Sequence, residues 1–229
     1  MENNKKNGSI QPIGSLLGCV RSTSDVQIAP DHQEQKKQAD LFKAACVKEC
    51  PSFEISDINR SIMNEIYLYA VGRSTKLDSS KGLWLHGPIG TGKSTIIQIL
   101  RTYDFLSKLD DVGWFSTGGF SIVSASLAAN MYVSKGLDGL NKMTYNDAKP
   151  VTVAFDEVGR EPYPVKHFGT EMNVMQFIFQ TRYELRYKCL THVTTNMKPE
   201  KIADVYGDYI ADRVNEMFNV IKIDGESRR

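Results

Sequence analysis

Apolar and polar positions divide the chain into regions with different rhythms. Residues 1 to about 35 combine Asn, Lys, Gln and Ser with scattered apolar residues, too few to build a core, so we expect either a mobile arm or an element that orders on a partner. Over residues 33–47 apolar side chains recur at three- and four-residue spacing, which predicts a helix. A second helix is predicted from Ser56 or Asp57, either of which can cap it, to Gly72.

Beyond residue 80, short apolar strands alternate with helices. This pattern is typical of an α/β fold, so we predict a three-layer sandwich around a mostly parallel five-stranded sheet. The predicted strands are residues 82–86, 120–124, 151–155, 189–194 and 220–223. The predicted helices are residues 94–106, 125–134, 171–187, 199–206 and a further helix that ends at Phe218. Ligands are expected at the carboxyl ends of the strands, where open α/β sheets bind them.

Composition fits a folded globular protein. With 41% hydrophobic and 24% charged residues, the chain does not resemble disordered, collagen-like or rod-shaped proteins. A formal net charge of +1 argues against binding nucleic acid through bulk electrostatics, so any DNA contact depends on a local basic strip or an assembled ring. No apolar run approaches membrane-spanning length and the polar start is unlike a signal peptide, so we expect a cytoplasmic protein with no membrane partner.

The four cysteines do not form a recognisable metal motif. Cys46 and Cys50 would share a helix face and could join Cys19 or His32 around a metal ion. No second close pair completes a zinc pattern, however, and Cys189 is distant in the sequence. Ordinary reduced thiols are therefore expected.

A phosphate-loop motif follows the first predicted strand. It reads Gly87-Pro88-Ile89-Gly90-Thr91-Gly92-Lys93-Ser94 and matches G-x-x-x-x-G-K-[ST] at every fixed position. Its glycines let backbone N–H groups curl inward, and the positive end of the next helix adds to them, so a nucleoside triphosphate is expected there. Lys93 is placed to reach the β- and γ-phosphates, Ser94 offers a hydroxyl to Mg²⁺, and Thr95 is expected near the α-phosphate.

Two carboxylates end the third predicted strand. Asp156 and Glu157 follow the apolar run 151–155, so the strand would deliver both beside the phosphate loop. Asp156 is the candidate for Mg²⁺, directly or through water, together with Ser94. Glu157 is the candidate general base that polarises the attacking water.

The fourth predicted strand ends in polar residues. Asn196 could hydrogen-bond the lytic water and the γ-phosphate, or could be a simple turn residue before Met-Lys-Pro. We favour the sensing role because of its place after the other motifs. His192 lies in the middle of this strand and is interpreted as a core or edge histidine.

Taken together, these motifs resemble a known family. The set comprises Gly87 to Ser94, Asp156-Glu157, Arg182-Tyr183-Glu184, Thr195-Asn196, a Tyr-Gly-x-x-Ile-x-x-Arg segment ending at Arg213, and a closing Gly-x-Ser-x-Arg. It resembles the AAA+ ATPases that load bacterial replicative helicases (DnaC-like) and the related transposition helper ATPases (IstB-like). The likeness covers about residues 55–229. It implies an AAA+ core without a C-terminal helical lid. The helical pattern over residues 33–47, which the likeness does not cover, adds a helical N-terminal extension to the predicted fold.

The resemblance assigns roles to three further positions. Asn196 falls on the sensor-1 position, and Arg229 matches the terminal arginine that acts somewhat like a sensor-2 group. Arg213 falls on the arginine finger that reaches the γ-phosphate of a neighbouring subunit. The alternative for Arg213 is a surface arginine paired with Asp212 or Glu216. A finger supplied in trans implies slow hydrolysis by a lone subunit and head-to-tail self-association.

One further segment is a candidate for DNA contact. Residues 131–149 mix lysines and tyrosines with glycines, and the resemblance places this region near single-stranded DNA. A solvated helix and loop with core tyrosines explains the same residues equally well. The connection 159–168 is longer than a simple strand-to-helix turn and could contact a neighbour.

The sequence predicts an ATP- and Mg²⁺-dependent ATPase of the helicase-loader type, which controls assembly with a replicative helicase and single-stranded DNA. Residues 1–50 would form a partly disordered partner-binding extension, and residues 51–229 the AAA+ ATPase core. A transposition helper acting with a transposase is the first alternative. A P-loop kinase is more distant, because no lid is evident, and a scaffold that uses ATP only to oligomerise leaves Glu157 without a role.

Overall fold

The computed structural model describes residues 32–51, 57–112, 119–145 and 149–225. Arg229, Cys19 and most of the predicted N-terminal arm lie outside these ranges. No described helix is long and apolar enough to cross a membrane.

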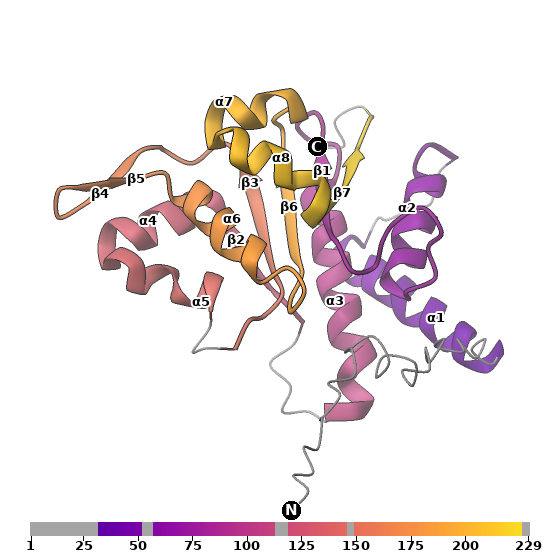
Figure 1. The fold of residues 1–229 in the computed structure, drawn as a ribbon. Coiled ribbons are helices and arrows are strands. Elements are labelled where there is room, and N and C mark those ends of the chain that lie inside the picture. Colours follow the sequence, from indigo (N-terminus) through magenta and orange to yellow (C-terminus); the bar gives the residue numbers. More distant parts are fainter. Residues whose placement is uncertain (1–31, 52–56, 113–118, 146–148, 226–229) are drawn as a thin grey trace, which may run out of the picture.

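A five-stranded parallel sheet forms the centre of the molecule, in the order β2-β3-β6-β1-β7. Its strands are β1 (Gly82–His86), β2 (Ser121–Ser124), β3 (Val153–Val158), β6 (Thr191–Thr195) and β7 (Phe218–Lys222). The predicted α/β class and strand number are confirmed. In Figure 1 the helices cover both faces of this sheet, which makes the three predicted layers.

Alternating side chains build a separate core on each face of the sheet. On β1, Leu83 and Leu85 pack with Ala154 against one set of helices, whereas Trp84 packs with Phe155 against the other. The first set is α1 (His32–Glu49), α2 (Asp57–Ala70) and α3 (Lys93–Val112). The second set is α4 (Ala125–Lys135), α6 (Val174–Glu184), α7 (Ile202–Tyr206) and α8 (Asp208–Met217). Both faces are therefore buried, as a parallel sheet requires.

Helix α1 packs on the main body through its contact with α3. The ring of Phe42 lies 5.3 Å from the ring of Tyr67 and 5.6 Å from that of Tyr103, measured between centroids. Ala45 and Cys46 are buried in the same contact. The region predicted as a partner-binding extension thus includes a helix that belongs to the core of the α3 face.

A β-hairpin replaces the start of one predicted helix. The prediction began that helix at residue 171, but β4 (Val165–His167) and β5 (Thr170–Met172) pair antiparallel, and α6 begins only at Val174. Phe168 and Gly169 form the turn with φ of 45° and 87°. Asn173 caps α6 by accepting a hydrogen bond from the backbone of Gln176. The hairpin projects from the side of the sheet near α4 (Figure 1).

Three smaller differences concern element ends and short helices. Strand β3 runs on through Asp156 and Glu157 to Val158, rather than ending at residue 155. Helix α6 ends at Glu184, not residue 187. The segment after α4 forms two short helices that the sequence did not predict, η4 (Gly136–Leu140) and α5 (Asn141–Thr144). A short turn, η5 (Pro199–Lys201), leads into α7.

Candidate functional site

The phosphate loop connects β1 to α3 at the carboxyl edge of the sheet. Gly87, Gly90 and Gly92 all have positive φ, at 148°, 83° and 90°. A Cβ atom on Gly87 would lie 2.2 Å from the carbonyl oxygen of Ile223, whose backbone N–H donates to His86 O at 2.8 Å. A glycine at position 87 thus lets β7 approach the loop while the backbone curls around a central space.

Lys93 lies at the centre of this loop. Its side-chain nitrogen donates to the carbonyl oxygens of Gly87 at 3.0 Å and of Pro88 at 2.6 Å. Thr91 braces the same turn by donating its hydroxyl to Pro88 O at 3.0 Å. Lys93 is 7% exposed, so its ammonium group is a positive charge concentrated inside a ring of backbone groups.

Ser94 and Asp156 contact each other at the base of the loop. The Ser94 hydroxyl donates to Asp156 Oδ1 at 2.8 Å, and the hydroxyl of Thr194 donates to the same carboxylate oxygen. The three side chains come from α3, β3 and β6. A hydroxyl beside a carboxylate is the donor set that Mg²⁺ prefers, so the two predicted metal ligands fit such an ion.

A bulge in β3 positions Glu157. Phe155 pairs with Val193 and Val158 with Thr195, so Asp156 and Glu157 together oppose a single residue. Glu157 has φ of 56° and its backbone N–H donates to the Thr194 hydroxyl at 3.1 Å. The bulge turns two successive side chains toward the same edge of the sheet, whereas a regular strand would point them to opposite faces.

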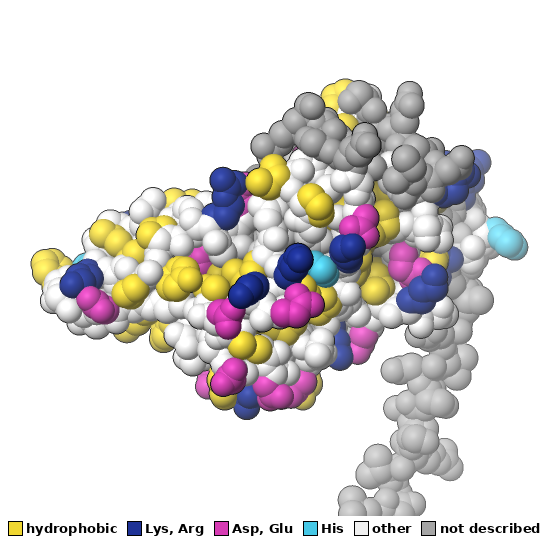
Figure 2. All heavy atoms as spheres, turned by 90° about the horizontal axis from the view of Figure 1, so that it is seen from above, with side chains coloured by type: hydrophobic (Ala, Val, Ile, Leu, Met, Phe, Trp, Pro, Cys, Tyr) yellow, Lys and Arg dark blue, Asp and Glu magenta, His cyan; other side chains and the backbone are white. Residues whose placement is uncertain are grey.

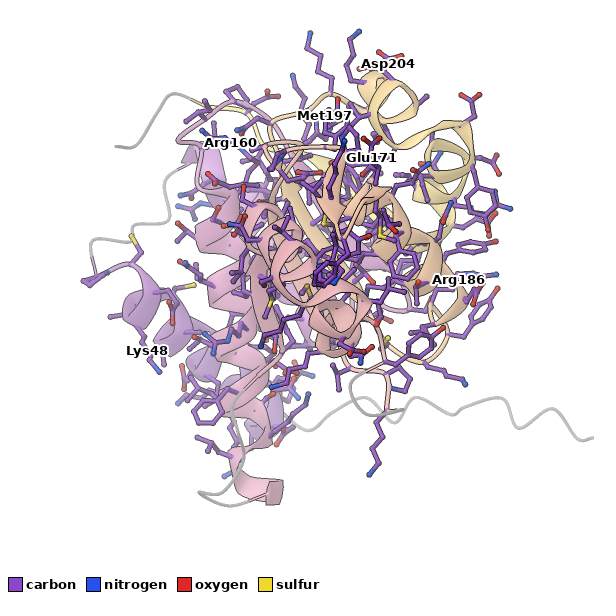
Figure 3. All side chains as sticks on the ribbon, turned by 90° about the vertical axis from the view of Figure 1, so that its left-hand side faces the viewer. Lys48, Arg160, Glu171, Arg186, Met197 and Asp204 are labelled. Carbon is purple, nitrogen blue, oxygen red and sulfur yellow. The ribbon has the colours of Figure 1, made fainter. Side chains whose placement is uncertain are left out.

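Arg160 is a neighbour of Glu157 that the sequence did not single out. Its guanidinium forms an ion pair with Glu157 Oε1 at 2.9 Å. Arg160 and Met197, both labelled in Figure 3, lie at the end of the molecule where β3 and β6 deliver their carboxyl ends. A charge three positions after a catalytic candidate is too common a pattern to have identified this pair.

Asn196 follows β6 directly and is exposed. The preceding residue anchors this turn, because the Thr195 hydroxyl donates to Val158 O at 2.6 Å and accepts from the backbone of Met197 at 2.9 Å. Thr195 was part of the motif set, but only the fold shows that Thr194 and Thr195 both bond to the bulged part of β3. Asn196 thus follows the strand that braces the bulge, and it lines the same pocket as Glu157.

A pocket of about 580 Å³ lies at this edge of the sheet, and the predicted residues Gly87, Pro88 and Asp156 are not part of its lining. From the predicted set it includes Ile89, Gly90, Thr91, Gly92, Lys93, Ser94, Thr95, Glu157 and Asn196. Helix α2 adds a wall that contains Ile62 and Met63, and the segment after β7 adds Lys222 and Asp224. The sequence analysis did not single out these residues, although Asp224 directly precedes Gly225, the first residue of the closing Gly-x-Ser-x-Arg motif, which also lines the pocket.

Solved structures with a similar fold were found by comparison of the whole chain. DnaI matches with a TM-score of 0.52 and 18% identity, over 83% of this chain and 93% of the DnaI chain. The DnaC helicase loader matches with a TM-score of 0.52 and 16% identity, over 77% of this chain and 96% of the other. A putative primosome component from Streptococcus pyogenes serotype M3 matches with a TM-score of 0.52 and 16% identity, over 82% and 99% of the two chains.

This chain shares the fold of DnaI and of the DnaC helicase loader. No family model and no curated protein matches the sequence itself. The resemblance to DnaC-like AAA+ proteins is thus confirmed as a shared fold that spans nearly the full length of the three solved chains.

Within this loader fold, Arg213 lies outside the pocket. It is on α8, where its Nη1 donates to Asp212 Oδ2 at 3.1 Å and to Tyr209 O at 3.3 Å. The ion pair with Asp212 is the contact expected of a surface arginine. Among the described lining residues, the cationic side chains are Lys93 and Lys222, and neither is an arginine.

Arg182 is buried within the loader fold and shapes it without touching the pocket. Its guanidinium is 0% exposed and donates to the Thr191 hydroxyl at 2.6 Å and to the carbonyls of Met143, Val151 and Leu190 at 2.7 to 2.9 Å. These bonds join α6 to the segments that precede β3 and β6. Burial lowers the pKa of Arg182 below its ordinary value.

His192 is a core residue, as the sequence interpretation preferred. Its Nδ1 accepts a hydrogen bond from the backbone N–H of Leu83 at 3.1 Å, and its ring lies 5.0 Å from that of Phe120. Burial, followed by the charge of Arg182, lowers the pKa of His192 to about 3. The ring is therefore neutral and acts as a hydrogen-bond acceptor between β6 and β1.

The alternative metal site is not supported by the part of the chain that is described. No group of three or more His, Cys, Asp or Glu residues in it is arranged to hold a metal ion. Burial raises the pKa of the Cys46 thiol to about 11, which disfavours the thiolate that binds zinc. Cys19 lies outside the described residues.

The segment considered for DNA contact is partly core. Tyr132 is 3% exposed and donates its hydroxyl to Thr170 O at 3.4 Å, so it packs under the hairpin. Tyr145, Lys135 and Lys142 are exposed, and residues 146–148 lie outside the described ranges. Figure 2 shows Lys and Arg side chains interspersed with Asp and Glu on the face that it displays. Any DNA contact there would depend on a few local residues.

Proposed function

We propose that this protein is an ATP- and Mg²⁺-dependent ATPase of the helicase-loader type. The observation that carries the proposal is the contact of Ser94 with Asp156 beneath a complete phosphate loop, with Glu157 on the wall of the same pocket. A structural glycine turn needs neither a hydroxyl bonded to a strand-end carboxylate nor a second carboxylate turned toward the loop by a bulge.

Each pocket residue has a role that its position supports. The loop N–H groups and Lys93 would bind the β- and γ-phosphates, and Ser94 and Asp156 would hold Mg²⁺. When bound, Mg²⁺ would neutralise part of the negative charge of the phosphates. Ile62 and Met63 on α2 form an apolar wall suited to a nucleobase. The phosphates thereby lie over the sheet edge, and the base toward α2.

Glu157 and Asn196 would act on the attacking water. Glu157 would accept its proton as the water attacks the γ-phosphorus and the bond to ADP breaks. Arg160 orients the carboxylate through the 2.9 Å ion pair. Asn196, which follows the anchored Thr195 and lines the same pocket as Glu157, would hydrogen-bond the same water and the γ-phosphate.

A second copy of the chain would complete the site. The described lining residues contain no arginine, whereas Arg213 lies on α8 outside the pocket. An arginine supplied in trans raises the rate of such sites by about 10³- to 10⁵-fold. We infer that copies stack head to tail, so that Arg213 of one copy approaches the γ-phosphate held by the next.

The proposed partners rest on the shared fold and on residues 1–50, which precede the proposed ATPase core. We infer a replicative helicase and single-stranded DNA as partners, since a solved structure with this fold is a DnaC helicase loader. A protein that acts with a transposase would use the same ATPase site, so the pocket does not distinguish a helicase partner from a transposase partner. Residues 1–50 are proposed to recognise the partner, with α1 fixing this extension to α3.

ATP turnover tests the site. Replacing Lys93 with Ala should lower ATP hydrolysis by about 10²-fold or more, because a preorganised charge at the γ-phosphate is lost. Lys201→Ala is the matched control, since Lys201 is an exposed lysine that pairs with Asp204. Equal rates in the wild type and the Lys93→Ala variant would refute the assignment.

Affinity purification tests the partner. A chain that starts at residue 32 keeps α1 on α3 and removes only the preceding segment. The full chain should retain a replicative helicase that the shortened chain loses. Retention of a transposase by the full chain would favour the transposition alternative.

A further inference from the structure

Tyrosine and arginine side chains interleave on a surface formed by the end of α6, the turn that follows it and α8. Arg186 lies 3.8 Å from the ring centroid of Tyr183 and 4.3 Å from that of Tyr187, measured from the guanidinium carbon. Arg213 lies 3.5 Å from the centroid of Tyr209 and 4.9 Å from that of Tyr183. Figure 3 shows Arg186 on the side of the molecule opposite α1 and α3.

Tyr183 and Tyr209 form an aromatic corner around Arg213. Their rings are 6.4 Å apart between centroids and meet at 76°, so the guanidinium lies against two nearly perpendicular rings. Tyr183 is itself fixed, because its hydroxyl donates to Glu216 Oε2 at 2.8 Å. The corner therefore constrains Arg213 from two helices, with Tyr183 near the end of α6 and Tyr209 on α8.

Arg213 is held without being fully covered. Its side chain is 24% exposed, and the acceptors found among the described residues, Tyr209 O and Asp212, both contact Nη1. A guanidinium stacked on aromatic rings keeps its charge and its in-plane donors while losing rotamer freedom. This is the arrangement that delivers a cation to an anionic group at low entropic cost.

We propose that Tyr183 and Tyr209 are positioning residues that orient Arg213 toward the triphosphate of a second copy of this chain. The inference rests on the proposed function, because it requires that Arg213 acts across copies. It adds that the rate of hydrolysis depends on two tyrosines that touch neither the nucleotide nor the pocket.

The test compares ATP turnover by full-length variants under assembling conditions. Tyr209→Ala should lower kcat about 10-fold or more, since misplacing a positioned group costs up to about 10²-fold. The KM for ATP should stay unchanged, because the corner is outside the pocket. Tyr209→Phe keeps the ring and should retain the wild-type kcat. Tyr187→Ala is the matched control, since Tyr187 stacks on Arg186 and not on Arg213.

A double variant separates positioning from folding. If Tyr209 acts through Arg213, then adding Tyr209→Ala to Arg213→Ala should produce no further loss of kcat. A full additional loss in the double variant, or an equal loss in Tyr209→Phe and Tyr209→Ala, would overturn the proposal. Thermal unfolding of each variant should match the wild type, because Tyr209 is 45% exposed.

The outcomes distinguish this inference from the proposed function. Loss of activity in Lys93→Ala and Arg213→Ala but not in Tyr209→Ala would leave the ATPase intact and overturn only the positioning role. Wild-type turnover in Arg213→Ala would overturn both the positioning role and the action in trans. Wild-type turnover in Lys93→Ala would refute the ATPase assignment itself.

Discussion

Buried polar side chains fix the positions of the strands that carry the site. Arg182 and His192 are buried in the core and hydrogen-bond to backbone groups. Neither has a carboxylate partner among the contacts described for it. Such groups contribute little net stability when satisfied and cost much when a partner is lost. Replacing either residue should therefore lower the free energy of unfolding, and any effect on ATP hydrolysis should follow from that loss of stability.

Arg182 provides the clearest stability prediction. Arg182→Met keeps much of the side-chain length but removes the donor described for the carbonyls of Met143 and Val151, while the carbonyl of Leu190 keeps only the N–H of Val153. We therefore expect a loss of about 3 kcal/mol or more in the free energy of unfolding. Urea denaturation measures this change. The exposed Lys188→Met is the control and should change stability by less than about 0.5 kcal/mol.

His192 predicts a pH dependence of stability. Its pKa is about 3 in the fold against an ordinary value of 6.5, so below pH 6.5 the unfolded chain binds a proton that the native chain does not. Stability is therefore fully present above pH 6.5 and falls by about 1.4 kcal/mol per pH unit as the pH drops toward 3. His192→Gln, whose side-chain oxygen can accept from Leu83, should flatten this slope. An unchanged slope would contradict the assignment, and His32→Gln is the exposed control.

At the scale of elements, the glycine of the phosphate loop couples β1 to β7. Gly87→Ala should destabilise the protein and weaken ATP binding, because its Cβ would lie 2.2 Å from Ile223 O. Gly225→Ala is a matched control for strain: its φ of 144° is close to the 148° of Gly87, but nothing lies within 4 Å of a Cβ there. If urea denaturation showed an equal loss of stability in both variants, the positive φ alone would explain the loss, and the close approach of Ile223 O to Gly87 would not contribute.

The elements also show what the sequence could and could not predict. The five strands were predicted because each is a short apolar run, and the phosphate loop because its fixed residues are contiguous. The hairpin at 165–172 was missed because a three-residue strand is too short to show a clear alternation of apolar and polar residues. The helical pattern next to it therefore dominated the prediction. The bulge that turns Glu157 is a register shift between strands far apart in sequence, and no local pattern reports it.

The predicted part of the site consists of residues at the ends of recognisable elements. The missed part depends on how helices pack against each other. Ser94 and Asp156 are 62 positions apart, yet both lie at predictable ends of elements and do meet. The aromatic corner around Arg213 depends on how α6 packs against α8, which neither helix encodes alone. The wall from α2 depends similarly on packing.

For the whole molecule, hydrolysis is expected to depend on the assembly of several copies. A pocket whose described lining lacks an arginine, together with an arginine held outside it, predicts that specific ATPase activity rises with protein concentration. Turnover per subunit measured over a dilution series checks this. Activity that is independent of concentration, with the protein monomeric throughout, would mean that one copy suffices.

A mixture of two inactive variants tests whether each ATPase site is shared between two copies of the chain. Glu157→Gln removes the proposed base but keeps Arg213, and Arg213→Ala keeps the base but lacks the arginine, so each alone should hydrolyse ATP slowly. In a mixture, an interface that combines the intact Glu157 of one copy with the intact Arg213 of the next should regain activity. Recovery well above the sum of the separate rates is the predicted result. No recovery, with both variants assembling like the wild type, would contradict a site shared between copies.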